Sequence, residues 1–82
     1  MTQIHKQWEE LKALHPEALL LYRTQQYYYA FNEDALCAAK ILNLEIHPAL
    51  LFKDACRFNV SCLGSYLPRL IRAGNKVAIF DA

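Results

Sequence analysis

The sequence predicts an α+β fold: one compact domain, residues 1–82, with a mixed β-sheet flanked by helices. Three observations support this. Helical and strand-like segments follow one another in the order α-β-β-α-(β)-β-α-β, and no regular βαβ repeat dominates. The chain has 82 residues, which is enough for one domain. Hydrophobic residues make up 55% of the chain, and so small a domain needs such a dense core.

The first helix and the first two strands are predicted within residues 3–31. Apolar residues at three- and four-residue spacings predict a helix over residues 3–15, with Thr2 as its cap. Residues 18–23 form a nearly continuous apolar run, which is typical of a strand buried on both faces, although a helix also fits it. Residues 26–31 are rich in tyrosine, and aromatic residues favour strands.

A second helix is predicted over residues 33–42, because alanine and leucine are good helix formers. Asn32 is expected to cap its start, and Asn43 to end it in a left-handed conformation. The pattern is weakest after this helix. Residues 44–46 indicate a short strand, and residues 56–60 alternate between apolar and polar, as in a half-buried strand.

The last helix has the clearest periodicity of the chain, with apolar residues at i, i+3, i+4, i+7 and i+8 over residues 63–71. Pro68 conflicts with a helix interior, because proline lacks a backbone N–H group. The conflict is smaller if Ser65 is the cap, since Pro68 then lies in the first turn. Gly74 is a suitable stop, and residues 75–80 predict a closing strand.

The tyrosine run of the second strand raises the question of function. In a strand, Tyr27, Tyr29 and Phe31 point to one face of the sheet. Tyr28 and Ala30 then point to the other face. One face must meet the core, so the other presents one or two tyrosines to solvent or to a partner. Two interpretations stay open: ordinary core and surface, or an aromatic surface that stacks on nucleic-acid bases or wedges between them.

Charge limits how strongly the chain can bind nucleic acid. The net charge is +1, whereas each neutralised phosphate needs a lysine or an arginine, so any binding to DNA should be weak and salt-dependent. Positive charge gathers late in the chain, at Arg69, Arg72 and Lys76. These residues and Arg23 are candidate phosphate contacts, and a solvated surface is the alternative.

Sequence signatures of enzymes are missing. There are only two glycines, Gly64 and Gly74, and no phosphate-binding loop or other catalytic motif, so we expect a non-catalytic protein without a cofactor. Cys37, Cys56 and Cys62 form no CxxC pair and predict free thiols rather than a metal site. The polar opening segment and the short apolar runs predict a cytoplasmic protein that does not enter a membrane.

Three ordered segments resemble the N-terminal mismatch-recognition domain, domain I, of the MutS DNA mismatch-repair family. They are WEELKALHPEALLLYR, YYYAFNEDALCAAKILNLEI and SYLPRLIRAGNKVAIFDA. The resemblance covers nearly all of the chain and is weakest over residues 47–62. It implies a MutS domain I-like fold in a stand-alone domain, without the ATPase, clamp and lever regions of the family.

The resemblance also implies a mechanism. In the family, a Phe-x-Glu motif enters the minor groove beside a mispair. The Phe ring stacks on the mispaired base and the Glu carboxylate accepts a hydrogen bond from it. Here Tyr27 stands at the Phe position and Tyr29 at the Glu position, with Gln25 and Gln26 in place of Gly-Asp. A tyrosine ring can still stack, but it cannot act as the carboxylate of the family's motif.

The sequence therefore predicts a non-catalytic module that binds mismatched or distorted DNA. Its proposed contacts are Tyr27 for stacking and Tyr29 as an auxiliary contact. Phosphate contacts are expected from the four basic residues Arg23, Arg69, Arg72 and Lys76. The alternative is a protein–protein interaction module that kept the fold but lost DNA recognition. A larger repair protein or another protein is the partner that this alternative requires.

Overall fold

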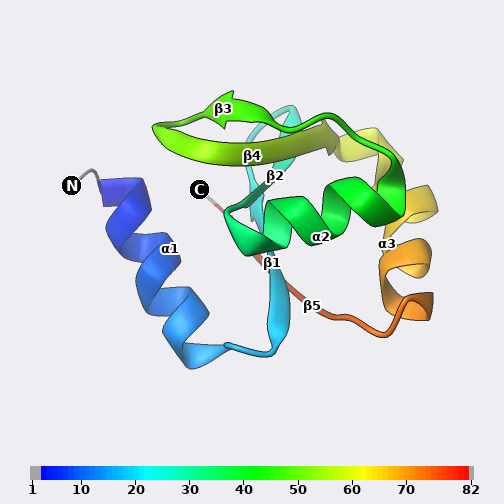
Figure 1. Cartoon of the computed structure of the whole chain (residues 1–82), viewed down its shortest axis with the longest axis horizontal. Coiled ribbons are helices and arrows are strands. Elements are labelled where there is room, and N and C mark those ends of the chain that lie inside the picture. The colour runs from blue at the N-terminus through cyan, green and yellow to red at the C-terminus, as the bar shows by residue number, and fades with distance from the viewer. Residues whose placement is uncertain (1–2, 82) are drawn as a thin grey trace.

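The computed structural model, which describes residues 3–81, is an α+β domain with its elements in the predicted order (Figure 1). The helices and strands are α1 (Gln3–Leu14), β1 (Ala18–Arg23), β2 (Tyr27–Phe31), α2 (Glu33–Leu42), β3 (His47–Ala49), β4 (Phe52–Asn59), a 3₁₀ turn (Val60–Cys62), α3 (Leu63–Arg72) and β5 (Lys76–Asp81).

All five strands belong to one mixed sheet, in the order β3-β4-β2-β1-β5. β1 pairs antiparallel with β2, and β2 and β3 each pair antiparallel with β4. β5 pairs parallel with β1, because the chain crosses the sheet through α2, β4 and α3 before it returns. The predicted mixed sheet is therefore confirmed.

Each face of the sheet has its own core. On one face, α2 and α3 cover Leu19, Leu21, Tyr28 and Phe58. On the other face, Trp8 of α1 packs on a second set of buried side chains, formed by Leu20, Tyr29, Phe31, Phe52 and Ala55. In Figure 1, α1 lies at the left of the molecule and α3 at the right. A single short helix thus covers the second face.

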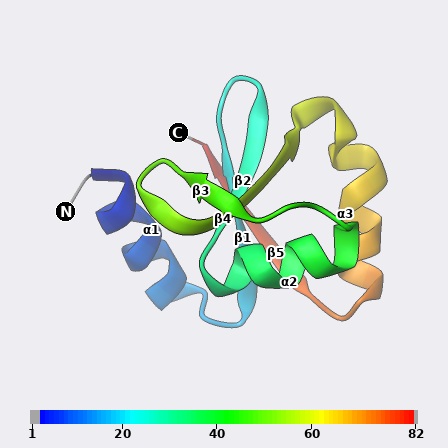
Figure 2. The same cartoon turned by 45° about the horizontal axis from the view of Figure 1, so that its top comes forward.

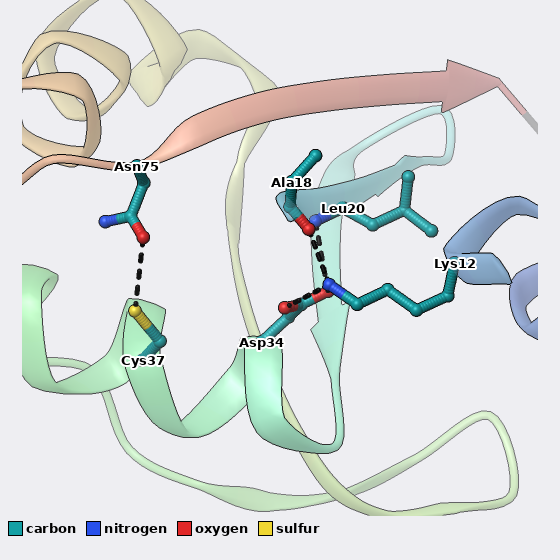
Figure 3. A network of polar contacts seen from close by, with 6 residues as sticks. All are labelled: Lys12, Ala18, Leu20, Asp34, Cys37 and Asn75. Atoms are coloured by element: carbon teal, nitrogen blue, oxygen red, sulfur yellow. Dashed lines mark hydrogen bonds and ion pairs between the residues drawn. The ribbon is translucent and has the colours of Figure 1, made fainter. Parts of the chain in front are cut away.

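A buried polar network ties α1 to the sheet and to α2 (Figure 3). The Lys12 ammonium donates to both carboxylate oxygens of Asp34, at 2.9 and 3.0 Å, and also to the carbonyl of Ala18. The same carboxylate accepts the backbone N–H of Leu20 at 3.1 Å. Only 10% of the Asp34 side chain and 23% of the Lys12 side chain are exposed. These hydrogen bonds join α1, β1 and α2 around the Asp34 carboxylate.

Both ends of α2 depart from ideal helix. Asn43 ends the helix in the left-handed conformation that was predicted, with φ 58° and ψ 49°. Asn32 is the N-cap residue, as predicted, but it has φ 56° and its side chain makes no capping hydrogen bond. The expected Thr2 cap of α1 lies outside the described residues.

Two predictions after α2 need correction. The short strand lies at His47–Ala49 rather than at residues 44–46. It tolerates Pro48 because it is an edge strand, where a missing N–H group breaks no sheet hydrogen bond. α3 begins at Leu63 rather than after Ser65, so Pro68 lies inside the helix.

Gly74 ends α3 with φ 96°, as expected, and β5 follows. Within residues 3–81, no helix combines the length and the apolar character that crossing a bilayer requires.

Candidate nucleic-acid interface

The β1–β2 hairpin projects beyond the rest of the sheet (Figure 2). The Thr24 hydroxyl closes its loop by accepting the backbone N–H of Tyr27 at 3.1 Å and donating to the carbonyl of Tyr27 at 3.0 Å. The backbone N–H of Thr24 donates to the same carbonyl at 2.8 Å. Gln25 and Gln26 turn the chain between them without a positive φ. A side-chain hydroxyl therefore makes the turn in place of a glycine.

Strand register brings side chains of four strands together on the face that α1 covers in part. Arg57 lies opposite Tyr29, Tyr29 opposite Tyr22, and Tyr22 opposite Phe80. Tyr27 lies one step nearer the hairpin loop, opposite Asn59. We call the group formed by Tyr22, Tyr27, Tyr29, Phe80 and Arg57 the aromatic face.

The rings of this face contact one another. The Tyr22 and Phe80 ring centroids are 4.8 Å apart, and those of Tyr27 and Tyr29 are 6.1 Å apart with the edge of one toward the other. Tyr29 also stacks on the fully buried Phe31 at 5.9 Å. The aromatic face therefore lies at the edge of the core beneath α1, and its rings pack against the buried side chains of that core.

The three tyrosines of the run differ in burial. Tyr28 is 6% exposed and stacks on Phe58 beneath α3, whereas Tyr29 is 8% exposed. Tyr27 alone is half-buried, so of the three only its ring offers accessible area. The expected alternation of the side chains is confirmed. Of the one or two tyrosines expected to face solvent or a partner, the fold leaves one, Tyr27, partly accessible, because helices lie over both faces.

Arg57 is the residue that sequence reasoning missed. Its guanidinium lies over the Tyr27 ring, 4.2 Å from the centroid, and its side chain is exposed. A hydrogen bond with the Tyr29 side chain raises the pKa of the Arg57 guanidinium above its ordinary value. Within residues 3–81, no salt bridge joins Arg57 to a carboxylate. Its charge therefore stays available to an anion.

The predicted basic residues do not share this face. Arg23 lies at the hairpin end but opposite Tyr28, so it points to the other side of the sheet, where it pairs with Asp81 at 3.7 Å. Lys76 pairs with Glu17 at 3.4 Å. It begins β5 opposite Ala18, five residues along the strand from Asp81, which is roughly 16 Å away.

Arg69 and Arg72 belong to α3, which packs on the face opposite the aromatic face. Arg69 donates to the carbonyl of Ile41 at 2.9 Å and lies beside the Tyr66 ring. Arg72 is exposed. Of the six predicted contact residues, only Tyr27 and Tyr29 belong to the aromatic face.

An open depression of ≈ 460 Å³ lies beside the aromatic face at the hairpin. It is lined by Thr24, Gln25, Gln26, Tyr27 and Tyr29. The exposed amides of Gln25 and Gln26 are neutral donors and acceptors. These two amides can hydrogen-bond to the edge of a base, but none of the five residues that line the depression has a carboxylate.

The three cysteines are free thiols. Burial raises the pKa of the Cys56 thiol to about 11, which leaves it a poor nucleophile. Among the described residues, no three histidine, cysteine or acidic side chains gather into a group that could hold a metal ion.

Comparison with known proteins gives a consistent result. The family model for MutS domain I matches residues 2–82. The protein named DNA mismatch repair protein MutS of Porphyromonas gingivalis is 38% identical over 84 residues, which covers 98% of this chain. The proteins of the same name from Phocaeicola vulgatus and Bacteroides fragilis are 38% and 40% identical, over 99% and 93% of this chain. The chain spans only 9% to 10% of the length of these relatives.

Proposed function

Because the chain belongs to the MutS domain I family, we propose that it is a non-catalytic module that binds mismatched or distorted DNA through the aromatic face. One observation carries the proposal: the Tyr27 ring is half-buried at the tip of a projecting hairpin, beside the exposed cation of Arg57. A flat ring next to an uncompensated positive charge suits a nucleobase and its phosphate.

Tyr27 is the stacking residue of the proposal. The Arg57 guanidinium lies over one side of the Tyr27 ring. A base would therefore stack on the other side of the ring, next to the depression at Gln25 and Gln26. Tyr29 is an auxiliary contact, because it is almost buried and holds both Tyr27 and Arg57 in place. Duplexes that are already weakened by a mispair are easier to distort, so deformability contributes to selectivity.

Phosphate contacts are assigned first to Arg57 and next to Arg23 at the same end of the sheet. Arg69, Arg72 and Lys76 are weaker candidates, because they lie on α3 or at the far end of β5. With so few cations near the ring, and a net charge of +1, binding is weak and falls as salt rises. No cofactor enters this function.

A protein–protein interaction module is the second candidate. Leu50 and Leu51 are 41% and 74% exposed at the β3–β4 turn, and both have positive φ, at 51° and 67°. Apolar side chains presented in this way suit a protein surface better than a phosphate backbone. In this reading Tyr27 is an interface anchor, a role in which tyrosine is enriched, and a larger repair protein is the partner class.

A fluorescence anisotropy titration separates the two candidates. Labelled duplexes with and without a single mismatch are titrated with the domain at low and moderate salt. The DNA-binding proposal expects binding that weakens with salt and falls about tenfold in Tyr27→Ala, because stacking contributes on the order of 1–3 kcal/mol per base. Tyr66→Ala is the matched control, a half-buried tyrosine on the opposite face. Absence of binding to any DNA, even at low salt, refutes the proposal and favours the second candidate.

A further inference from the structure

The aromatic face has the shape of a platform rather than of a wedge. A side chain that enters between base pairs must project freely, but Tyr27 is half-buried and lies against Arg57 and Tyr29. Tyr29 is almost fully buried, and Tyr22 is half-buried like Tyr27. Such a surface can bind bases that are already unpaired more easily than bases that are still stacked within a duplex.

The platform extends across the sheet. Arg57, Tyr29, Tyr22 and Phe80 form one row over β4, β2, β1 and β5. Neighbouring strands are about 4.8 Å apart, so the row is roughly 14 Å long. Tyr27 stands at one side of this row, and the half-buried Phe80 at its end, which gives two separate ring surfaces for bases. Small sheets in RNA-binding domains stack two or three unpaired bases on such aromatic rows.

Charge and hydrogen-bonding groups agree with this shape. Arg57 lies at the end of the row without a carboxylate partner, where it can meet one phosphate of a strand that crosses the sheet. The neutral amides of Gln25 and Gln26 line the depression beside Tyr27 and can bond base edges that pairing no longer occupies. Asn59, opposite Tyr27, can only donate, because its amide oxygen accepts two hydrogen bonds from Ser61. No acidic residue stands in the row itself. Asp81, which lines a second depression with Gln25, pairs with Arg23 on the other side of the sheet.

From these observations we infer that the ligand of the aromatic face is an unpaired, single-stranded nucleic-acid segment. Its bases stack on Tyr27 and on the Tyr22–Phe80 pair, and one phosphate binds Arg57. The inference rests on the proposed function and narrows it: the domain takes the unpaired part of a distorted site and not the mispaired duplex around it. A single cation implies a shallow salt dependence, with a slope of log K against log salt of about −0.7.

The test compares three labelled probes in one anisotropy series: a short oligothymidylate, the matched duplex of the same length and the same duplex with a mismatch. We expect the single strand to bind at least about tenfold more tightly than either duplex, with the shallow slope given above. Arg57→Gln should reduce binding by severalfold and flatten the slope. Arg57 is exposed, so this change should leave the fold intact.

Lys40→Gln is the matched control, since Lys40 is an exposed cation on α2, which packs on the opposite face of the sheet. It should leave binding to the single strand unchanged. Preference for the mismatched duplex, with loss in Tyr27→Ala, would overturn this inference and leave the proposed function standing. Absence of binding to all three probes would overturn both. Binding that Lys40→Gln weakens more than Arg57→Gln would place the contact on α2 and also overturn the inference.

Discussion

Replacing Asp34 by alanine should cost this domain about a third or more of its stability. The carboxylate accepts both the Lys12 ammonium and the Leu20 N–H, and it is 10% exposed. Breaking a buried ion pair from one side costs about 3–5 kcal/mol. Lys12 keeps the Ala18 carbonyl and is 23% exposed, so the loss falls at the low end of that range. We expect about 3 kcal/mol, of a total of about 5–10 kcal/mol for so small a domain.

Urea denaturation followed by Trp8 fluorescence measures this loss. Trp8 is the single tryptophan and is buried in the core that α1 forms with the sheet. In thermal unfolding, a loss of about 3 kcal/mol lowers Tm by roughly 12–24 °C for a domain of this size. Asp34→Asn keeps an acceptor for Leu20 and should lose less. Glu33→Gln is the control, an exposed carboxylate in the same turn of α2. A loss below about 1 kcal/mol in Asp34→Ala would refute the reasoning, since the pair would then behave like a surface ion pair.

Three further outcomes follow from the structure. Burial raises the pKa of the Cys56 thiol from 9.0 to about 11, so the folded state holds this proton more tightly than the unfolded state does. In urea titrations, the stability of the parent protein should therefore fall relative to that of Cys56→Ala as the pH rises from about 9 to 11. Parallel stability curves for the two proteins would contradict this. Thr24→Val removes both hydroxyl contacts of the hairpin loop and should cost about 1 kcal/mol, with Thr24→Ser close to the parent; equal losses in the two variants would exclude the hydroxyl as the cause. Pro68→Ala restores a backbone donor inside α3 and should raise the urea midpoint, by about 2 kcal/mol in stability, and a lower midpoint would show that the proline ring contributes packing.

Much of the fold follows from local sequence patterns. The runs that became β1, β2 and α2 were predicted to within one residue, because their hydrophobic period and their caps lie within the same short segments. The suggestion that Ser65 caps α3 was wrong for the opposite reason. Pro68, near the middle of the helix, favoured a later start. In the structure the 3₁₀ turn ends directly before Leu63, and the buried Leu70 packs into the core, so the helix continues through Pro68.

The candidate site was predicted only in part. Tyr27 and Tyr29 came from the sequence, since strand alternation places them on one face. Arg57 was missed although it lies in a clearly alternating strand, because nothing local indicates which tyrosine a residue of β4 will face. The register that sets Arg57 opposite Tyr29 joins positions 28 residues apart and depends on the whole sheet. The basic residues chosen from sequence proximity lie instead on the other face or at the other end.

The sequence by itself determined where the helices and strands lie outside residues 44–60, and which side chains of each predicted strand share a face. Those properties depend on periods of two and of 3.6 residues, which a short stretch of chain specifies alone. The tertiary structure decided that α1 covers part of one face and leaves an aromatic margin with an arginine at its end. That arrangement depends on side chains that meet only after the strands have paired and the Lys12–Asp34 ion pair has placed α1 on the sheet. Local sequence patterns therefore cannot predict it.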